Sequence, residues 1–140
     1  MIWFKPYTIK DWEGKDIDTI HKSLGIEITE IGEDTILGRI PIDKRTQQQL
    51  GYLHGGASIV LAESLGSIGS AMIINPEKYI VVGQTITANH IRPGIKGWAT
   101  GKAKTIHIGK RSHIWDIEIL SDENKIISTC RLTVAVVKKP

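Results

Sequence analysis

The sequence is poor in cysteine: its 140 residues include one, Cys130. A single thiol forms no intrachain disulfide and no multi-cysteine zinc site, and this usage fits a reducing compartment. Because Cys130 alternates with apolar neighbours, we interpret it as a buried structural thiol rather than a nucleophile. The sequence has no Gly-x-Ser-x-Gly elbow, and His54 lacks the spacing of a zinc ligand. We therefore expect neither a metal nor a cofactor.

Long apolar runs and blocks of like charge are also scarce. The N-terminus has no basic segment followed by a long apolar stretch, which argues against a signal peptide. The only transmembrane candidate, residues 57–74, contains Glu63, four serines and two glycines, and is a poor bilayer span. The net charge is only +3, without any basic run, and the four tryptophans do not interleave with basic residues. We expect a cytoplasmic protein that binds neither membrane nor nucleic acid.

The length and composition favour one globular domain over residues 1–140. Hydrophobic residues make up 41% and charged residues 24%, a balance that excludes intrinsic disorder. The sequence has no internal repeat, low-complexity tract or linker, so we divide it no further.

Two segments have helical patterns. Apolar spacing predicts a short amphipathic helix over Asp16–Leu24, with Gly25 as its C-terminal cap. A long helix is predicted from Gly55 to Ile74, ended by Asn75-Pro76. One stripe of this helix consists of small residues: Ser58, Ala62, Gly66, Gly69 and Ser70. The stripe predicts unusually close packing of the helix against a neighbouring element.

The rest of the chain is strand-like and predicts an α+β fold. Expected strands cover Ile26–Ile28, Thr35–Ile40, Tyr79–Arg92 with an interruption at Gly83, Gly97–Ile108, Ser112–Leu120 and Ile126–Val136. The short turns at Pro93-Gly94, Gly109-Lys110 and residues 122–124 predict antiparallel strands joined by hairpins. A single apolar helix needs cover on most sides, so we expect a curved antiparallel sheet of about six strands wrapped around it.

Two features of the long helix suggest chemistry. Glu63 is its only ionisable side chain, and a carboxylate among apolar neighbours is costly unless it is paired, hydrogen-bonded or at an interface. At the helix start, His54-Gly55-Gly56 exposes backbone N–H groups that can polarise a carbonyl or bind an anion. A solvated Glu63 and a plain turn at His54 are the simpler alternatives. Gly55 and Glu63 lie roughly 12 Å apart along the axis, so they serve one reactive centre only across a subunit interface.

Two basic clusters lie at predicted strand ends. They are His90-Ile91-Arg92 and His107-Ile108-Gly109-Lys110-Arg111. Positive groups at turns can contact a phosphate, although solvated turn charges give the same pattern.

The combined motifs resemble the hotdog-fold acyl-CoA thioesterases of the phenylacetic-acid-degradation type. The resemblance covers nearly the whole chain and is carried by Gln48, Leu53–Ser58, Leu61–Ser64, Gly66-Ser67, Val82-Gly83, Ala88–Arg92, His107–Gly109, Trp115–Ile117 and Arg131–Thr133. Within the family it is strongest for the branch of 1,4-dihydroxy-2-naphthoyl-CoA hydrolases and enterobactin proofreading thioesterases. It implies a hotdog fold, a dimer of dimers and active sites at the dimer interface.

The resemblance also implies residue roles. The Gly55 N–H would polarise the thioester carbonyl, and Glu63 of the other subunit would act as nucleophile or general base. Gln48, Ser67 and His54 match the remaining catalytic positions. Segments that hold the pantetheine arm and phosphates match Gly83, His90, Ile91, Arg92, Pro93, His107, Ile108, Gly109, Lys110, Arg111 and Ser112. The implied substrate is an aromatic acyl-CoA; the alternatives are an acyl or aryl carrier-protein thioester, a medium-chain acyl-CoA, or acyl-CoA binding without catalysis.

Overall fold

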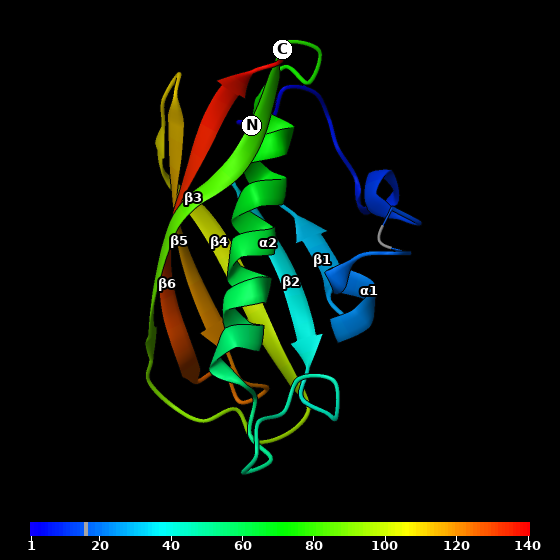
Figure 1. Ribbon diagram of the computed structural model, residues 1–140, viewed down its shortest axis with the longest axis vertical. Helices are drawn as coiled ribbons and strands as arrows, with labels where there is room; N and C mark the ends of the chain where they lie inside the picture. Colours follow the sequence, from blue (N-terminus) through cyan, green and yellow to red (C-terminus); the bar gives the residue numbers. More distant parts are fainter. Residues whose placement is uncertain (16) are drawn as a thin grey trace.

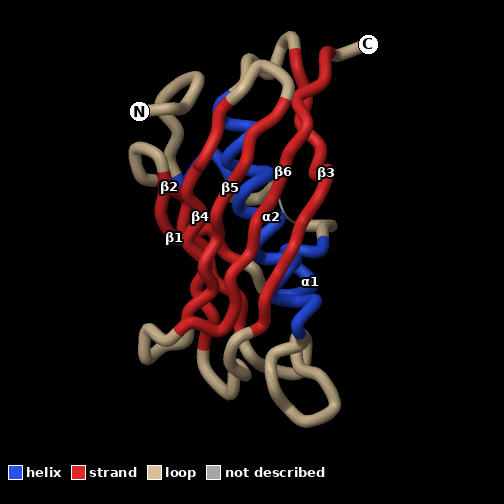
Figure 2. Tube along the Cα trace, turned by 90° about the vertical axis from the view of Figure 1, so that its left-hand side faces the viewer, coloured by secondary structure: helices blue, strands red, loops and turns tan. Residues whose placement is uncertain are grey.

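The computed structural model describes residues 1–15 and 17–140. A six-stranded antiparallel sheet curves around one long helix, α2 (Gly55–Ile73), as Figures 1 and 2 show. The strand order is β1-β2-β4-β5-β6-β3. The strand bounds are β1 Glu27–Ile31, β2 Thr35–Pro41, β3 Tyr79–His90, β4 Trp98–Ile108, β5 Ser112–Leu120 and β6 Ile126–Lys138. This arrangement confirms the predicted α+β fold, with a curved sheet around a single long helix.

The core lies between α2 and the concave face of the sheet. Strand β5 alternates as its sequence predicts: Trp115, Ile117 and Ile119 are buried, whereas Asp116 and Glu118 are exposed. The small-residue stripe of α2 faces this core, and all five of its members are buried. Because side chains at Gly66 or Gly69 would collide with Leu132 or Trp115, these glycines let the helix approach the sheet closely.

Helix α2 is also the one described helix that is long and apolar enough to cross a bilayer by length and composition alone. Its buried face packs on β2 to β6, so that this helix forms part of the core.

The predicted connection between β3 and β4 is wrong. Pro93-Gly94 is not a hairpin turn, because β3 pairs with β6 at the far side of the sheet. The intervening residues cross one end of the molecule (Figure 1). They are held there by backbone hydrogen bonds from Ile91 N–H to Ile127 O and from Leu53 N–H to Gly94 O, each 2.8 Å long. The predicted hairpins at Gly109-Lys110 and residues 122–124 are confirmed.

Strand β3 is therefore an edge strand. It pairs only with β6 among the described strands, and most of its 12 residues are exposed. The expected interruption at Gly83 is a register shift in the β3–β6 pairing between Gly83 and Thr85.

The N-terminal helix is shorter than predicted. Helix α1 spans Ile20–Leu24, because the backbone of Thr19 is extended; Asp16, where the prediction began, lies outside the described residues. Ile17 and Ile20 are more than half exposed, so the predicted apolar face is covered only at its second half. Gly25 caps the helix in the left-handed conformation, with φ of 73°, as predicted.

Candidate active site

The N-terminus of α2 presents a free backbone donor. His54 is the N-cap, and its Nδ1 accepts a 2.8 Å hydrogen bond from the Gly56 N–H. The Gly55 N–H donates to none of the described residues, as expected of the first residue in a helix. The helix dipole adds partial positive charge at this point. An oxygen that accepts a hydrogen bond from the Gly55 N–H would thus lie in an electrostatic field that stabilises negative charge on it.

A cavity of about 310 Å³ lies beside this helix end. It brings together six residues singled out from the sequence: Gln48, Gly55, His90, Ile91, Arg92 and Pro93. The His90 ring lies against Gly55, since a Cβ on that glycine would be 2.9 Å from His90 Nε2. Arg92 is anchored through a 2.7 Å hydrogen bond from Nη1 to the Ile126 carbonyl. The β2–α2 loop, the first turn of α2 and the end of β3 therefore converge on one site.

Gln48 is held in a tight turn within the β2–α2 loop. Its N–H donates to the Tyr52 carbonyl at 2.8 Å, and its side-chain Oε1 accepts from the Leu50 N–H. The side-chain amide group donates to none of the described residues, which leaves it available to a ligand. His54 lines a neighbouring opening with residues 47–50.

Glu63 lies on the same helix but away from this cavity. Its side chain is half-buried and lies against Gly83 of β3. Ser67 follows one turn later, also half-buried. Neither residue lines the cavity beside Gly55. Within one chain the two halves of the predicted catalytic set are thus separate, in agreement with the axial spacing.

The second predicted binding segment lies at the other end of the sheet. Residues 107–112 comprise the end of β4, the β4–β5 turn and the first residue of β5, and a 2.9 Å hydrogen bond from Gly109 N–H to Ser112 O closes the turn. Figure 1 shows this turn and the segment after His90 at opposite ends of the molecule. One chain therefore does not bring His90–Pro93 and His107–Ser112 together.

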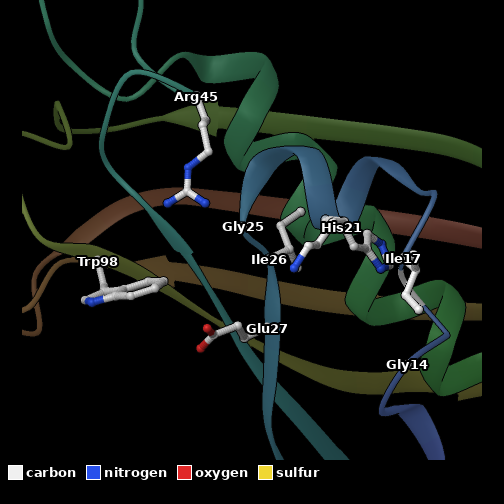
Figure 3. Close-up of a pocket in the computed structure, with 9 residues that line it drawn as sticks. Gly14, Ile17, His21, Gly25, Ile26, Glu27, Arg45 and Trp98 are labelled. Atoms are coloured by element: carbon white, nitrogen blue, oxygen red, sulfur yellow. The ribbon is translucent and has the colours of Figure 1, made fainter.

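A second cavity, of about 390 Å³, was not anticipated from the sequence. It lies between α1, the start of β1 and the β2–α2 loop (Figure 3), and its lining includes His21, Glu27, Arg45 and Trp98. Two of its charged side chains are already paired: Arg45 contacts Asp43 at 2.6 Å, and Glu27 contacts Arg39 at 2.8 Å. Hydrogen bonds from Arg45 lower the pKa of the Asp43 carboxyl. The only sequence signal for this site was the polarity of the loop at 43–49.

Two buried groups complete the chemistry of the interior. Cys130 is 4% exposed, which confirms its predicted burial, and this burial raises the pKa of its thiol. His113 is 2% exposed, and its Nδ1 has no hydrogen-bond partner among the described residues.

Across the described ranges, no three histidine, cysteine or acidic side chains are grouped so that they could hold a metal ion.

Comparison with known proteins decides the family. The family model of the thioesterase superfamily matches residues 50–128, more than half of the chain. The chain belongs to the thioesterase superfamily. A mutant thioesterase from Pseudomonas aeruginosa has a similar structure, with a TM-score of 0.97, 36% identity, and coverage of 99% of this chain and all of that one. This likeness confirms the hotdog fold expected from the resemblance.

Two curated relatives of this thioesterase-family chain have names that specify a substrate or role. The 1,4-dihydroxy-2-naphthoyl-CoA hydrolase of Escherichia coli K12 is 38% identical over 97% of this chain and 99% of its own length. The proofreading thioesterase EntH of Cronobacter turicensis is 37% identical over 97% of this chain and 98% of its own. Membership of this hydrolase family confirms the predicted enzyme class, a hydrolase of thioesters.

Proposed function

We propose that this thioesterase hydrolyses an aromatic acyl-CoA, such as 1,4-dihydroxy-2-naphthoyl-CoA, to the free acid and CoA. The observation that carries the proposal is that one helix carries both a free N–H, at Gly55, and an unengaged carboxylate, at Glu63. Glu63 forms no hydrogen bond or ion pair with any described residue, although its side chain is half-buried. The name of the Escherichia coli relative favours an aromatic acyl group.

In the proposed reaction the thioester carbonyl accepts a hydrogen bond from the Gly55 N–H. On the general-base route, Glu63 takes a proton from water while the water oxygen bonds to the carbonyl carbon. Negative charge then develops on the carbonyl oxygen, where the N–H and the helix dipole stabilise it. Loss of the CoA thiolate, which takes up a proton, leaves the acid. On the covalent route, Glu63 itself attacks the carbonyl carbon and expels the thiolate, and water then hydrolyses the anhydride.

Supporting roles follow from position. The Gln48 amide and His54 lie at or beside the Gly55 cavity, where they would orient the carbonyl and shape the acyl site. Ser67, one turn after Glu63, would orient the carboxylate or the water. Phosphates and pantetheine would contact the segments His90–Pro93 and His107–Ser112, which carry the cations Arg92, Lys110 and Arg111.

We propose that two copies of the chain build each site. The free edge of β3 can pair with β3 of a second copy, because its outer N–H and C=O groups have no strand partner in the described chain. Gly55 of one copy would then face Glu63 of the other, and two such dimers would form a tetramer.

We propose that the enzyme acts in the cytoplasm, in menaquinone synthesis.

A second candidate is proofreading of a carrier-protein thioester, which the similarity to EntH favours. The same residues would perform the hydrolysis, and a carrier protein would replace the nucleotide part of CoA. The two candidate substrates differ in the group that carries the pantetheine arm, which is a nucleotide in CoA and a protein in the carrier-protein thioester.

The test is thiol release from benzoyl-, hydroxynaphthoyl-, phenylacetyl- and straight-chain acyl-CoA. Wild type is compared with Glu63→Gln, and Glu118→Gln is the control because that carboxylate is exposed on β5. We expect the highest activity on an aromatic acyl-CoA, lost in Glu63→Gln and kept in the control. Full activity of Glu63→Gln would overturn the mechanism. Measurable CoA binding without hydrolysis of any panel member would instead favour the carrier-protein substrate.

A further inference from the structure

Gly83 leaves space for the Glu63 carboxylate. A Cβ added to Gly83 would overlap Oε1 of Glu63 and would lie 3.2 Å from its Cδ and 3.7 Å from its Cγ. The backbone of Gly83 is not in the left-handed region, unlike that of Gly25 or Gly97, so its conformation does not require glycine. The neighbouring carboxylate occupies the space that a side chain at this position would take, so a side chain here would displace the carboxylate.

No hydrogen bond or ion pair with a described residue holds the Glu63 carboxylate. Its position therefore depends on the space beside it, which Gly83 leaves open. Gly83 pairs with Val134 of β6, and the register shifts at the next residue, Gln84. Such a bulge re-aims the strand locally, and here it occurs beside the one acidic side chain of α2.

We propose that Gly83 is a positioning residue for Glu63, rather than a contact to CoA as the resemblance implies. The inference rests on the proposed function, because it assigns Gly83 to the carboxylate that performs the hydrolysis. The two roles have different kinetic consequences. A lost CoA contact raises KM, whereas a displaced carboxylate lowers kcat with little change in KM.

Kinetics of Gly83→Ala test the proposal first. We expect kcat on the best panel substrate to fall by about tenfold to a hundredfold, with KM within about twofold, since a displacement near 1 Å costs that much. Gln84→Ala, a change in the exposed neighbour in the bulge, is the control and should stay within about twofold of wild type. An increase in KM alone, or an unchanged kcat, would overturn the assignment.

A shortened carboxylate provides the rescue. Aspartate at position 63 lacks one methylene group, so its carboxylate would overlap the added methyl group less than that of glutamate does. In the Glu63→Asp background, Gly83→Ala should therefore lower kcat by less than about threefold, which is a non-additive result. An equal loss in both backgrounds would contradict the proposal, because it would show that Gly83 acts independently of residue 63.

Thermal unfolding tests the contact without reference to activity. Gly83→Ala should change Tm less favourably in the wild-type background than together with Glu63→Ala, where the overlapping atoms are absent. If Gly83→Ala fails to fold, the double variant should fold; failure of both would overturn the proposal. If Glu63→Gln remained fully active while this cycle showed coupling, the contact would stand and only the proposed function would fail.

Discussion

The indole Nε1 of Trp115 donates a 2.9 Å hydrogen bond to Oγ of Ser70, joining β5 to α2. Both residues are completely buried. The same ring occupies the space that a side chain at position 69 would need, since a Cβ on Gly69 would lie 2.5 Å from Trp115 Cη2. The polar contact and the close approach therefore depend on two adjacent small residues of the helix, Ser70 and Gly69.

Overpacking in Gly69→Ala should cost about 1–3 kcal/mol, because the added methyl group forces the Trp115 ring or the helix to move. Alanine gains about 1 kcal/mol over glycine in a helix interior, so the expected net loss of stability is up to about 2 kcal/mol. Urea unfolding at neutral pH measures the difference. A variant more stable than wild type would show that the helix can retreat from the sheet without cost.

Ser70→Ala should cost about 1–3 kcal/mol for a different reason, because it leaves the buried indole N–H without an acceptor. Ser70→Thr is the comparison, since it keeps the hydroxyl and adds a methyl group. If Ser70→Ala had wild-type stability by urea unfolding, the hydrogen bond to Trp115 would contribute nothing net.

His113 should make the fold sensitive to acid. Burial, followed by the nearby His107, lowers the pKa of His113 below its ordinary value of 6.5. The unfolded chain therefore binds more protons than the folded one below that pH, so the contribution of His113 to stability is present above pH 6.5 and is lost as the pH falls toward the folded pKa. The slope reaches at most about 1.4 kcal/mol per pH unit.

The check is urea unfolding of wild type and His113→Leu at pH 7.5, 6.5 and 5.5. Leucine does not titrate, so the variant should lose less stability on acidification than wild type does. His107→Gln is the control and should keep most of the wild-type slope, because burial is the larger cause of the shift. Parallel profiles for wild type and His113→Leu would refute this explanation.

His21 should hold the short N-terminal helix against the long one. Its Nε2 lies 2.7 Å from Oγ of Ser64, across the boundary between α1 and α2. His21→Ala should cost about 0.5–1.5 kcal/mol and speed amide exchange over residues 20–26. Lys22→Ala, a change in the exposed neighbour, should do neither. Unchanged exchange in His21→Ala would mean that other contacts hold α1.

The helices and strands that were predicted well are those in which the apolar or small-residue pattern of the sequence matches the face that the structure buries. Alternation along β5 and the small-residue stripe of α2 both describe faces that the structure buries. The N-terminal helix was predicted too long because apolar spacing alone did not detect the extended backbone at Thr19. Pro93-Gly94 looked like a hairpin because turn residues do not reveal which strand lies next in the sheet.

The candidate site was predictable in part. Gly55 and Gln48 were singled out with His90, and one cavity contains all three. The contact between Gly83 and Glu63 was not predictable, because it depends on the side-chain position of Glu63 across a strand bulge. Arg45 and Trp98 were missed because their cavity has no motif, only the packing of three separate segments.

A mixing experiment tests whether two copies share each site. Glu63→Gln and Gln48→Ala should each be nearly inactive alone, since one lacks the carboxylate and the other the amide beside Gly55. In a mixed dimer, the site that takes Gln48 from one copy and Glu63 from the other is intact. Random pairing makes about half of the dimers mixed, with one intact site in each, so the mixture should recover about a quarter of wild-type activity.

The two variants are co-refolded with different affinity tags, and sequential purification on both tags isolates the species that contain both variants and confirms exchange. These species should have at least about a quarter of wild-type kcat with an ordinary KM, because each mixed dimer within them has one whole site of two. Activity no higher than the mean of the two parents would place Gln48 and Glu63 of one chain in the same site. The axial spacing of roughly 12 Å between Gly55 and Glu63 argues against that outcome, since a water and a carbonyl do not span it.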